Sequence, residues 1–356
     1  MYTTAALGAV FFYLMSLNEE TNKASFIPID FSVLHTRNVI IPRNILRGTP
    51  RITSSESESE SVYAVILDNT KQGRPQYGIA DAPLVYEFPV EGGVTRLLAF
   101  FDDAKDIPQI GPVRSTRLYV NSLARGFGAI FAHSGGSPNG LADLVYDKEG
   151  IINIDEIGPS GKYFWRDRSS LPPYNLFTRV DLLWKAKRDF NDHGLRTVTF
   201  ASAPWDWQES DRGETVTENT RVHQKVFIDY SNSAFFVEYR FNAEGKFYER
   251  YMAGKVHTDT EGNAVQVNNI LVAFVDVRVI DEVGRLEVTL TGRGNAFACS
   301  NGMCSPSFWY KETNKTPLQF FTTDDYEGKE EQKIKLVPGT TWVHLVPSNR
   351  TAEYLE

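Results

Sequence analysis

The chain has 356 residues and a formal net charge of −8, with 45 acidic and 37 basic residues. This balance argues against a general nucleic-acid surface, because such surfaces carry a basic patch or face. Aromatic residues make up 13% of the sequence, and the length is sufficient for two folded domains. We therefore expect a folded protein without a nucleic-acid partner.

The first 60 residues have the layout of an anchor and a spacer. Thr4 to Leu17 is a nearly uncharged apolar stretch that is short for a bilayer and lacks a basic flank. We expect residues 1–17 to be the remnant of a signal anchor that contacts a membrane; a buried helix of the folded body is the alternative. Residues 18–60 include the alternating Ser/Glu run Thr53–Glu60, which cannot bury apolar surface. We expect them to form a polar tether.

The first predicted strand is Val62–Leu67, and Asp68 follows it directly. Binding and catalytic residues of α/β sheets lie at the carboxyl ends of strands. Asp68 is therefore a candidate catalytic carboxylate, and Arg74 in the following loop is a candidate ligand-binding residue. A solvated loop position is the alternative for Asp68, as it is for His133 at the end of a later strand.

Leu84–Phe101 predicts two further strands joined near Gly92–Gly93. Glu87 on the first strand is a second candidate catalytic carboxylate. Glu91 and Arg96 flank the turn and are candidate ligand contacts. On a straight strand Glu87 and Glu91 would lie roughly 13 Å apart, too far to share a proton.

A helix is predicted from Ser115 onward, after Gly111–Pro112. Arg114 and Arg117 are three residues apart at its start, so their guanidinium groups can converge on one side. Cations are unfavourable at a helix N-terminus unless an anion lies between them and the dipole. That anion is either an internal carboxylate or a bound phosphate or carboxylate ligand, which guanidinium groups bind bidentately.

A buried strand, a glycine turn and a helix follow one another in 128–145. Backbone N–H groups of such a turn and the positive helix end point toward one place, which favours an anion. The alternative is a tight connection in which Ser137 only caps the helix that begins at Pro138. His133 is also a catalytic candidate, with a hydrogen bond to the backbone at the strand end as its alternative role. The predicted ligand-binding residues of this turn are His133, Ser134, Gly135, Gly136 and Ser137.

Aromatic and basic residues gather in 162–175. Trp165, Arg166 and Asn175 in a polar loop would suit a sugar ring or a peptide. Closure of the core beneath a proline-rich loop is the alternative use of these aromatic residues. The next predicted element is a helix over Arg179–His193, ended by Gly194.

Helical periodicity disappears beyond about Thr215. We expect an α+β fold with an N-terminal α/β domain of mixed sheet over 61–205 and a C-terminal antiparallel β-rich domain over 215–350. Pro204–Thr220 would join the two domains. His257 is a candidate binding residue that the second domain could bring to the cleft. The predicted strands of that domain are Lys225–Tyr230, Ala234–Phe241, Asn269–Arg278, Arg285–Leu290 and Trp342–Val346.

The two cysteines flank an Asn-Gly hairpin turn. Paired strands would bring Cys299 and Cys304 to bonding distance, so a disulfide is expected in an exported protein and two free thiols are the alternative. Two cysteines without a second ligand pair do not form a recognisable zinc site. The sequence predicts no metal site and identifies no cofactor.

Taken together, these segments resemble the YerB-like lipoproteins of bacteria from about Val62 to Ser348. The family is a domain of unknown function, so the resemblance implies a location and no reaction: export, and attachment at the extracytoplasmic face of the cytoplasmic membrane. One departure concerns the anchor, because a lipoprotein needs a cysteine directly after its signal peptide and only Cys299 and Cys304 are present. The matching segments are Asp68–Asn69, Arg74–Gln76, Tyr86–Arg96, Gly111–Ser115, His133–Ser137, Tyr163–Asp167, Pro173–Leu176, Gly254–Asp259 and Pro338–Trp342.

Three functional hypotheses remain open. The first is a membrane-tethered binding or scaffolding protein of the cell envelope. It would engage an anionic or glycan ligand, as an envelope polymer or an anionic small molecule, through Arg114, Arg117 and the glycine turn. The second is a phosphotransferase or hydrolase acting on phosphate-linked wall polymers, in which arginines bind a pyrophosphate while Asp68 or Glu87 holds Mg²⁺ or acts as base. The third is a purely structural envelope component. Arginines already paired with Glu87 or Glu91 would favour a scaffold over an enzyme. No nucleophilic triad can be assembled.

Overall fold

The computed structural model describes residues 43–50, 61–103, 105–146, 149–192, 203–209, 222–322 and 332–355. The predicted anchor and most of the predicted tether lie outside these residues. Residues 43–50 depart from the expectation for the tether, because Leu46 is fully buried and Asn44 donates a hydrogen bond to Asp102. Ile45 and Leu46 are both buried and attach this segment to the core. Two adjacent apolar residues are too few to produce a hydrophobic periodicity that the sequence analysis could detect. The helices of the described residues include none that is long and apolar enough to cross a membrane.

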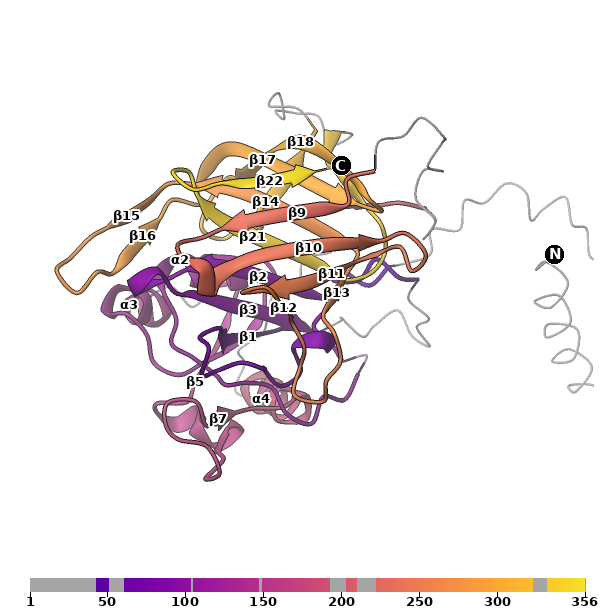
Figure 1. Cartoon of the computed structure of the whole chain (residues 1–356). Helices are drawn as coiled ribbons and strands as arrows, with labels where there is room; N and C mark the ends of the chain where they lie inside the picture. Colours follow the sequence, from indigo (N-terminus) through magenta and orange to yellow (C-terminus); the bar gives the residue numbers. More distant parts are fainter. Residues whose placement is uncertain are drawn as a thin grey trace, which may run out of the picture. The chain divides into compact units, whose positions relative to one another are not determined.

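A ten-stranded mixed sheet forms the centre of the fold (Figure 1). Most of its strands are continuous apolar runs, as expected for strands that are covered on both faces. Its strands, in order from one edge to the other, are β19 (Gln319–Phe321), β18 (Met303–Lys311), β17 (Gly292–Ser300), β14 (Asn269–Val275), β21 (Thr341–Pro347), β2 (Leu84–Pro89), β3 (Thr95–Phe101), β1 (Tyr63–Asp68), β4 (Ile130–His133) and β5 (Ile152–Asp155).

Strands from both halves of the chain therefore share this sheet. β21, near the end of the sequence, lies between β14 and β2 and is parallel to both. β2, β3 and β1 pair antiparallel, whereas β1, β4 and β5 are parallel. The expected α+β class is confirmed, with a mixed sheet in the N-terminal region and antiparallel hairpins in the C-terminal region.

Alternate residues of β1 point into two separate cores, as the pleat of a strand requires. Val65 and Leu67 lie in the first core, which also contains Val237 and Tyr239 of a second, antiparallel sheet. The second sheet therefore covers one face of the central sheet. Its strands are β12 (Lys255–Val256), β11 (Phe247–Met252), β10 (Phe236–Asn242), β9 (Lys225–Asp229) and β22 (Ala352–Leu355), and β13 (Gln266–Val267) pairs with β11.

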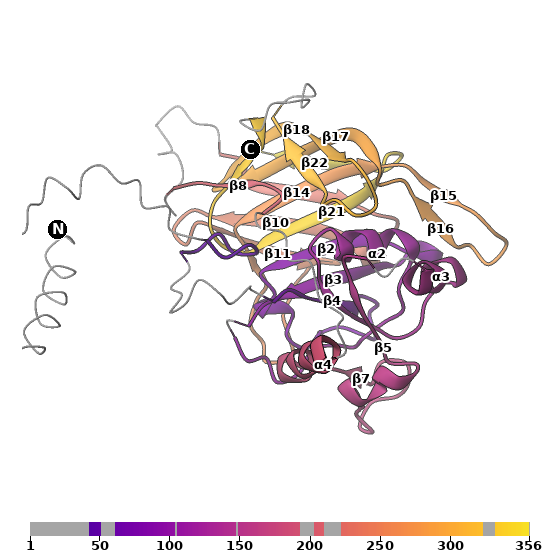
Figure 2. The ribbon, with the colours of Figure 1, turned by 180° about the vertical axis from the view of Figure 1, so that it is seen from behind.

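The three helices of the described residues cover both faces of the central sheet. α4 (Val180–Asp192) packs on the first core, and α2 (Leu118–Arg125) and α3 (Pro138–Tyr146) pack on the second (Figures 1 and 2). α3 begins at the predicted proline. α2 begins three residues later than predicted, because Thr116 is extended and pairs with Gly136. Short 3-10 turns are η2 (Ile79–Asp81), η3 (Glu91–Gly93), η4 (Pro159–Tyr163) and η5 (Ser233–Phe235).

Two hairpins complete the C-terminal region. β15 (Val277–Val279) and β16 (Leu286–Val288) form an arm that projects from the body (Figure 1). β17 and β18 are joined at Asn301 and Gly302, both with positive φ, as the tight turns favoured in hairpins require. Cys299 lies opposite Cys304 in this hairpin, and the two form a disulfide. Two-residue strands elsewhere are β6 (Trp165–Arg166), β7 (Leu176–Phe177), β8 (Asp206–Trp207) and β20 (Lys335–Leu336).

The strands predicted beyond Thr215 correspond to β9, β10, β14, β16 and β21. The predicted join, Pro204–Thr220, is described only to residue 209. In this part Trp205 is buried and β8 pairs with β20. His193 and Gly194, the predicted end of α4, lie outside the described residues.

Candidate functional site

Four arginines lie around the carboxyl end of β1, and we call Arg74, Arg96, Arg114 and Arg117 the arginine cluster. Arg96 on β3 stands directly opposite Asp68, the last residue of β1. β1 and β4 stop pairing after Val65, and the extended segment 112–116 then pairs with the end of β1 and with the glycine turn after β4. This arrangement explains why Arg114, far from β1 in sequence, reaches Asp68.

Asp68 is 1% exposed and its two oxygens are occupied. One accepts hydrogen bonds from the backbone N–H and the hydroxyl of Thr70, at 2.7 and 2.5 Å. The other lies 2.8 Å from Nε of Arg114. Arg114 therefore neutralises a buried carboxylate, which is the internal partner that the sequence left open for these arginines.

Arg117 is also paired internally. Its Nε and Nη2 donate to the two carboxylate oxygens of Glu91, at 2.7 and 2.5 Å, and its Nη1 donates to the carbonyl of Thr116. Although burial alone would raise it, the hydrogen bonds from Arg117 hold the pKa of Glu91 below its usual value. The two N–H groups with which Arg117 could bind a ligand bidentately therefore already bind Glu91.

Arg96 and Arg74 form no ion pair with a carboxylate of the described residues. Arg96 donates to the carbonyl of Ser115 at 2.6 Å, and burial together with the charges of Arg117 and Arg114 lowers the pKa of Arg96 to about 10. Arg74 donates only to the carbonyls of Thr70 and Ala234. Among the described residues, Arg96 and Arg74 are thus the members of the cluster without a direct carboxylate partner, although Asp68 acts favourably on the charge of both.

The predicted glycine turn lies beside the arginine cluster, but the backbone N–H groups of Ser134, Gly135 and Ser137 are used within the chain. The N–H groups of Ser134 and Ser137 donate to the carbonyls of Arg114 and Thr116. Gly135 has a positive φ, and its N–H donates to a carboxylate oxygen of Asp155 at 2.7 Å. Asp155 is thus an internal anion at this turn.

Two further residues of the turn have structural contacts. His133 is fully buried, with its ring nitrogens 2.9 Å from the carbonyl of Gly135 and 2.7 Å from Oδ1 of Asn153, and burial lowers the pKa of His133. This contact is the alternative role given for His133 above. Ser137 accepts a hydrogen bond from the N–H of Gly140 and so caps α3.

The loop that contains Trp165 adjoins the cluster. Arg166 donates to Glu156 at 2.9 Å and to Asn175 at 3.1 Å, and Ser134 donates to the same glutamate. The ring of Tyr174 lies 5.8 Å from the guanidinium of Arg114. Trp165 is half-buried and packs against Phe177 and Arg179.

Glu87 lies in a different environment, inside the protein between the two sheets. It pairs with Arg250 of β11 at 2.6 Å, and both side chains are fully buried. Asn69 and Thr95 donate to its other oxygen, at 3.0 and 2.8 Å. His344 of β21 lies 3.5 Å from Glu87, and its ring nitrogens contact the hydroxyls of two tyrosines.

His257 belongs to this buried set, which we call the Glu87 network. Arg250 donates to Nδ1 of His257, and Nε2 of His257 donates to Gln76 at 2.8 Å. Burial and the charges of Arg250 and Arg74 hold the pKa of His257 well below its usual value. Burial and the charge of Arg250 do the same for the pKa of His344. The network consists of Asn69, Gln76, Glu87, Thr95, Tyr230, Tyr239, Arg250, His257 and His344.

The sequence reasoning missed Arg250 and His344. Each interrupts an apolar register: Arg250 lies between the buried residues Tyr248 and Met252, and His344 lies within the fully buried strand β21. A charged or polar side chain at a buried strand position was the available signal. Because Asp68 and Glu87 are both buried and paired, neither presents an open carboxylate. The described residues contain no group of three or more His, Cys, Asp and Glu side chains placed to hold a metal ion.

Comparisons with known proteins agree with the resemblance expected from the motifs. A family described as "Protein of unknown function (DUF3048)" matches residues 46–193 with its N-terminal domain and 226–343 with its C-terminal domain. The chain is 30% identical over 349 residues to "Putative lipoprotein YerB" of Bacillus subtilis (strain 168), covering 97% of this chain and 95% of that protein. The crystal structure of YerB from Bacillus subtilis is similar, with a TM-score of 0.71 and 27% identity over 87% of this chain and 99% of that chain.

Proposed function

We propose that this chain, which belongs to the DUF3048 family, is a membrane-tethered protein outside the cytoplasm that binds an anionic ligand of the cell envelope at its arginine cluster. The name of the relative supports the location, because lipoproteins are exported and membrane-attached. A ligand with a phosphate or carboxylate group fits the cluster, because guanidinium groups bind such oxygens through paired, charge-assisted hydrogen bonds.

The observation that carries this proposal is that Arg96 and Arg74 donate to backbone carbonyls and form no ion pair within the part of the chain that the structure describes. Both side chains are half-buried, and Arg96 is surrounded by the like charges of Arg114 and Arg117. Holding cations together in this way costs free energy, and a bound anion would recover it. Arg114 and Arg117 already form ion pairs with Asp68 and Glu91. In this proposal they position the cluster and do not contact the ligand directly.

The test compares arginines that differ in their internal partners. Arg96→Ala and Arg74→Ala remove groups without a carboxylate partner. Arg240→Ala, on the exposed face of β10 and paired with Glu238, is the matched control. Titration calorimetry with pyrophosphate and with a polyanionic phosphodiester polymer should show binding by wild type and Arg240→Ala. Each cluster variant should lose roughly 1.5–3 kcal/mol of binding free energy.

If the wild-type protein binds none of these anions, the proposal of an anionic ligand is wrong. The hypothesis of a purely structural envelope component would then be favoured. Binding that is equally weakened by Arg240→Ala would indicate general attraction to the surface. The location is tested separately: protease added to intact cells stripped of their wall should digest the folded body. A protected body would place it in the cytoplasm.

A further inference from the structure

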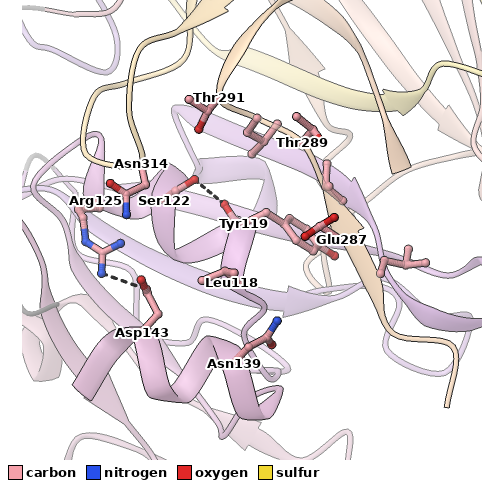
Figure 3. A pocket seen from close by; sticks show the side chains of 13 residues that line it. Leu118, Tyr119, Ser122, Arg125, Asn139, Asp143, Glu287, Thr289, Thr291 and Asn314 are labelled. Carbon is pink, nitrogen blue, oxygen red and sulfur yellow. Dashed lines mark hydrogen bonds and ion pairs between the residues drawn. The ribbon is translucent and has the colours of Figure 1, made fainter. Parts of the chain in front are cut away.

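A pocket of about 340 Å³ lies between α2, α3 and β16, and its lining residues Leu118 and Tyr119 directly follow Arg117 of the arginine cluster in the chain (Figure 3). None of its lining residues belongs to either group. The volume is at the small end of the range of about 300–1,000 Å³ found for small-molecule sites. The pocket therefore has the size for one small ring or chain rather than for a long polymer.

The charges around the pocket are balanced. Arg125 of α2 pairs with Asp143 of α3 at 3.0 Å, and Glu287 of β16 pairs with Arg278 of β15. An anionic ligand would face the carboxylates of Asp143 and Glu287, and a cationic one would compete with arginines that already hold them. The balance therefore favours an uncharged ligand, in contrast to the arginine cluster.

The polar groups at the pocket nevertheless require a ligand that forms hydrogen bonds. The hydroxyls of Thr289 and Thr291 and the side-chain amide of Asn314 are exposed and have no side-chain partner among the described residues. These groups both donate and accept hydrogen bonds. An apolar ligand would displace the water bound to these groups without replacing its hydrogen bonds, and each lost hydrogen bond would cost binding free energy. A ligand with several hydroxyls replaces the water directly.

The apolar part of the lining is rigid. The hydroxyl of Tyr119 donates to the carbonyl of Pro89 at 2.7 Å, and its ring packs edge-on against Phe88. Tyr119 is 6% exposed, so its hydroxyl is not available to the pocket and only a small part of its ring borders it. Leu118, which is 40% exposed, and the buried Val288 lie beside it. An apolar surface bordered by hydroxyl and amide groups matches a molecule with C–H groups on its face and hydroxyls on its edge.

We infer that this pocket binds a neutral sugar unit. The ring C–H groups of the sugar pack on Leu118, beside the small exposed part of Tyr119, and its hydroxyls bond to Thr289, Thr291 and Asn314. This site is separate from the arginine cluster, so the inference does not rest on the proposed function. It gives the protein a second recognition surface, for an uncharged part of a carbohydrate.

The experiment is saturation-transfer NMR with the full chain and a methyl glycoside of a hexose, a methyl glycoside of an N-acetylhexosamine, and a hexose 6-phosphate. Wild type should transfer saturation to at least one neutral glycoside at millimolar concentration. Thr291→Val and Asn314→Ala should each weaken its affinity about fivefold, the typical effect of one hydrogen bond. Thr260→Val, at an exposed threonine in the loop before β13, is the matched control and should bind as wild type.

Arg96→Ala separates this site from the arginine cluster, because it should leave binding of the neutral glycoside unchanged. The inference is overturned if neither neutral glycoside receives saturation, or if Thr291→Val and Asn314→Ala bind as well as wild type. It is also overturned if only the sugar phosphate binds and Arg96→Ala abolishes that binding. That last result would support the arginine cluster alone.

Discussion

The arginine cluster and the Glu87 network are built from the same residue types but differ in charge balance and burial. In the network, Arg250 and Glu87 neutralise each other where neither touches solvent. In the cluster, Arg114 and Arg117 have carboxylate partners, whereas Arg96 and Arg74 have none among the described residues. A fully buried ion pair, such as Glu87 with Arg250, holds two sheets together. Half-buried arginines that have no ion pair among the described residues are suited to binding an anionic ligand. Charge balance and exposure, rather than residue type, separate these roles.

The largest expected effect is in the network. Glu87→Gln should lower the free energy of unfolding by about 3–5 kcal/mol, because it leaves the charge of Arg250 buried without a partner. Urea denaturation measures the change. Glu238→Gln, whose partner Arg240 is exposed, is the control and should cost about 1 kcal/mol or less. Equal effects of the two variants would contradict the distinction between network and surface pairs.

A double variant sharpens the same result. Glu87→Gln combined with Arg250→Met leaves no unpaired charge in the interior. It should therefore be more stable than Glu87→Gln alone, because removing one partner of a buried pair leaves an uncompensated charge and removing both does not. A double variant that is less stable than the sum of the single changes would show that the pair itself, rather than the unpaired charge, supplies the stability.

Within the cluster, Arg114 and Arg96 should respond in opposite ways without ligand. Arg114→Ala should cost about 2–3 kcal/mol of stability, because buried Asp68 loses its partner. Arg96→Ala removes a cation that burial and two neighbouring arginines disfavour, so its stability should equal or exceed that of wild type. Thermal unfolding in an anion-free buffer compares them. Loss of stability in Arg96→Ala as large as in Arg114→Ala would make Arg96 a structural residue.

The disulfide lies outside both the arginine cluster and the Glu87 network, so its contribution to stability is a reference for the effects above. Reduction should lower stability by roughly 2 kcal/mol, as the chain-entropy relation gives for a short loop. This loss should be the same with and without pyrophosphate. Mass measurement before and after reduction and alkylation checks that Cys299 and Cys304 are oxidised in exported protein. Alkylation of both thiols in native material would contradict it.

The most gradual expected effect is the pH dependence from buried histidines. His257 and His344 stay neutral in the folded protein, whereas in the unfolded chain they take up protons near pH 6.5. Below that pH the unfolded state binds more protons, so stability falls as pH falls; above it these groups contribute no slope. Each contributes at most about 1.4 kcal/mol per pH unit. His344→Gln should flatten the curve of melting temperature between about pH 7 and about pH 5, and an unchanged slope would contradict the assignment.

Local patterns were sufficient for several elements. Pro138 after a capping serine predicts the start of α3, and the amphipathic stretch after Arg179 predicts α4. The Asn-Gly turn predicts the hairpin that joins Cys299 to Cys304. Each of these depends on contacts within a few residues, so the sequence contains the whole signal. The convergence of Arg114 with Asp68 was not visible in this way, because segment 112–116 reaches β1 only when β1 and β4 diverge.

The sequence by itself determined many of the helices and strands, where the hairpin turn lies and which residues carry charge, but it did not reveal β5, β11 or β22. Only the tertiary structure decided which charges meet. Glu87 and Arg250 are 163 residues apart, and their pairing requires the second sheet to pack on the central one, where β21 lies between β14 and β2. The same packing pairs Asp68 with Arg114 and Glu91 with Arg117, and it leaves Arg96 without an ion pair in the described part of the chain. Local periodicity reports which side of an element is buried, but it contains no information about the partner on the other side.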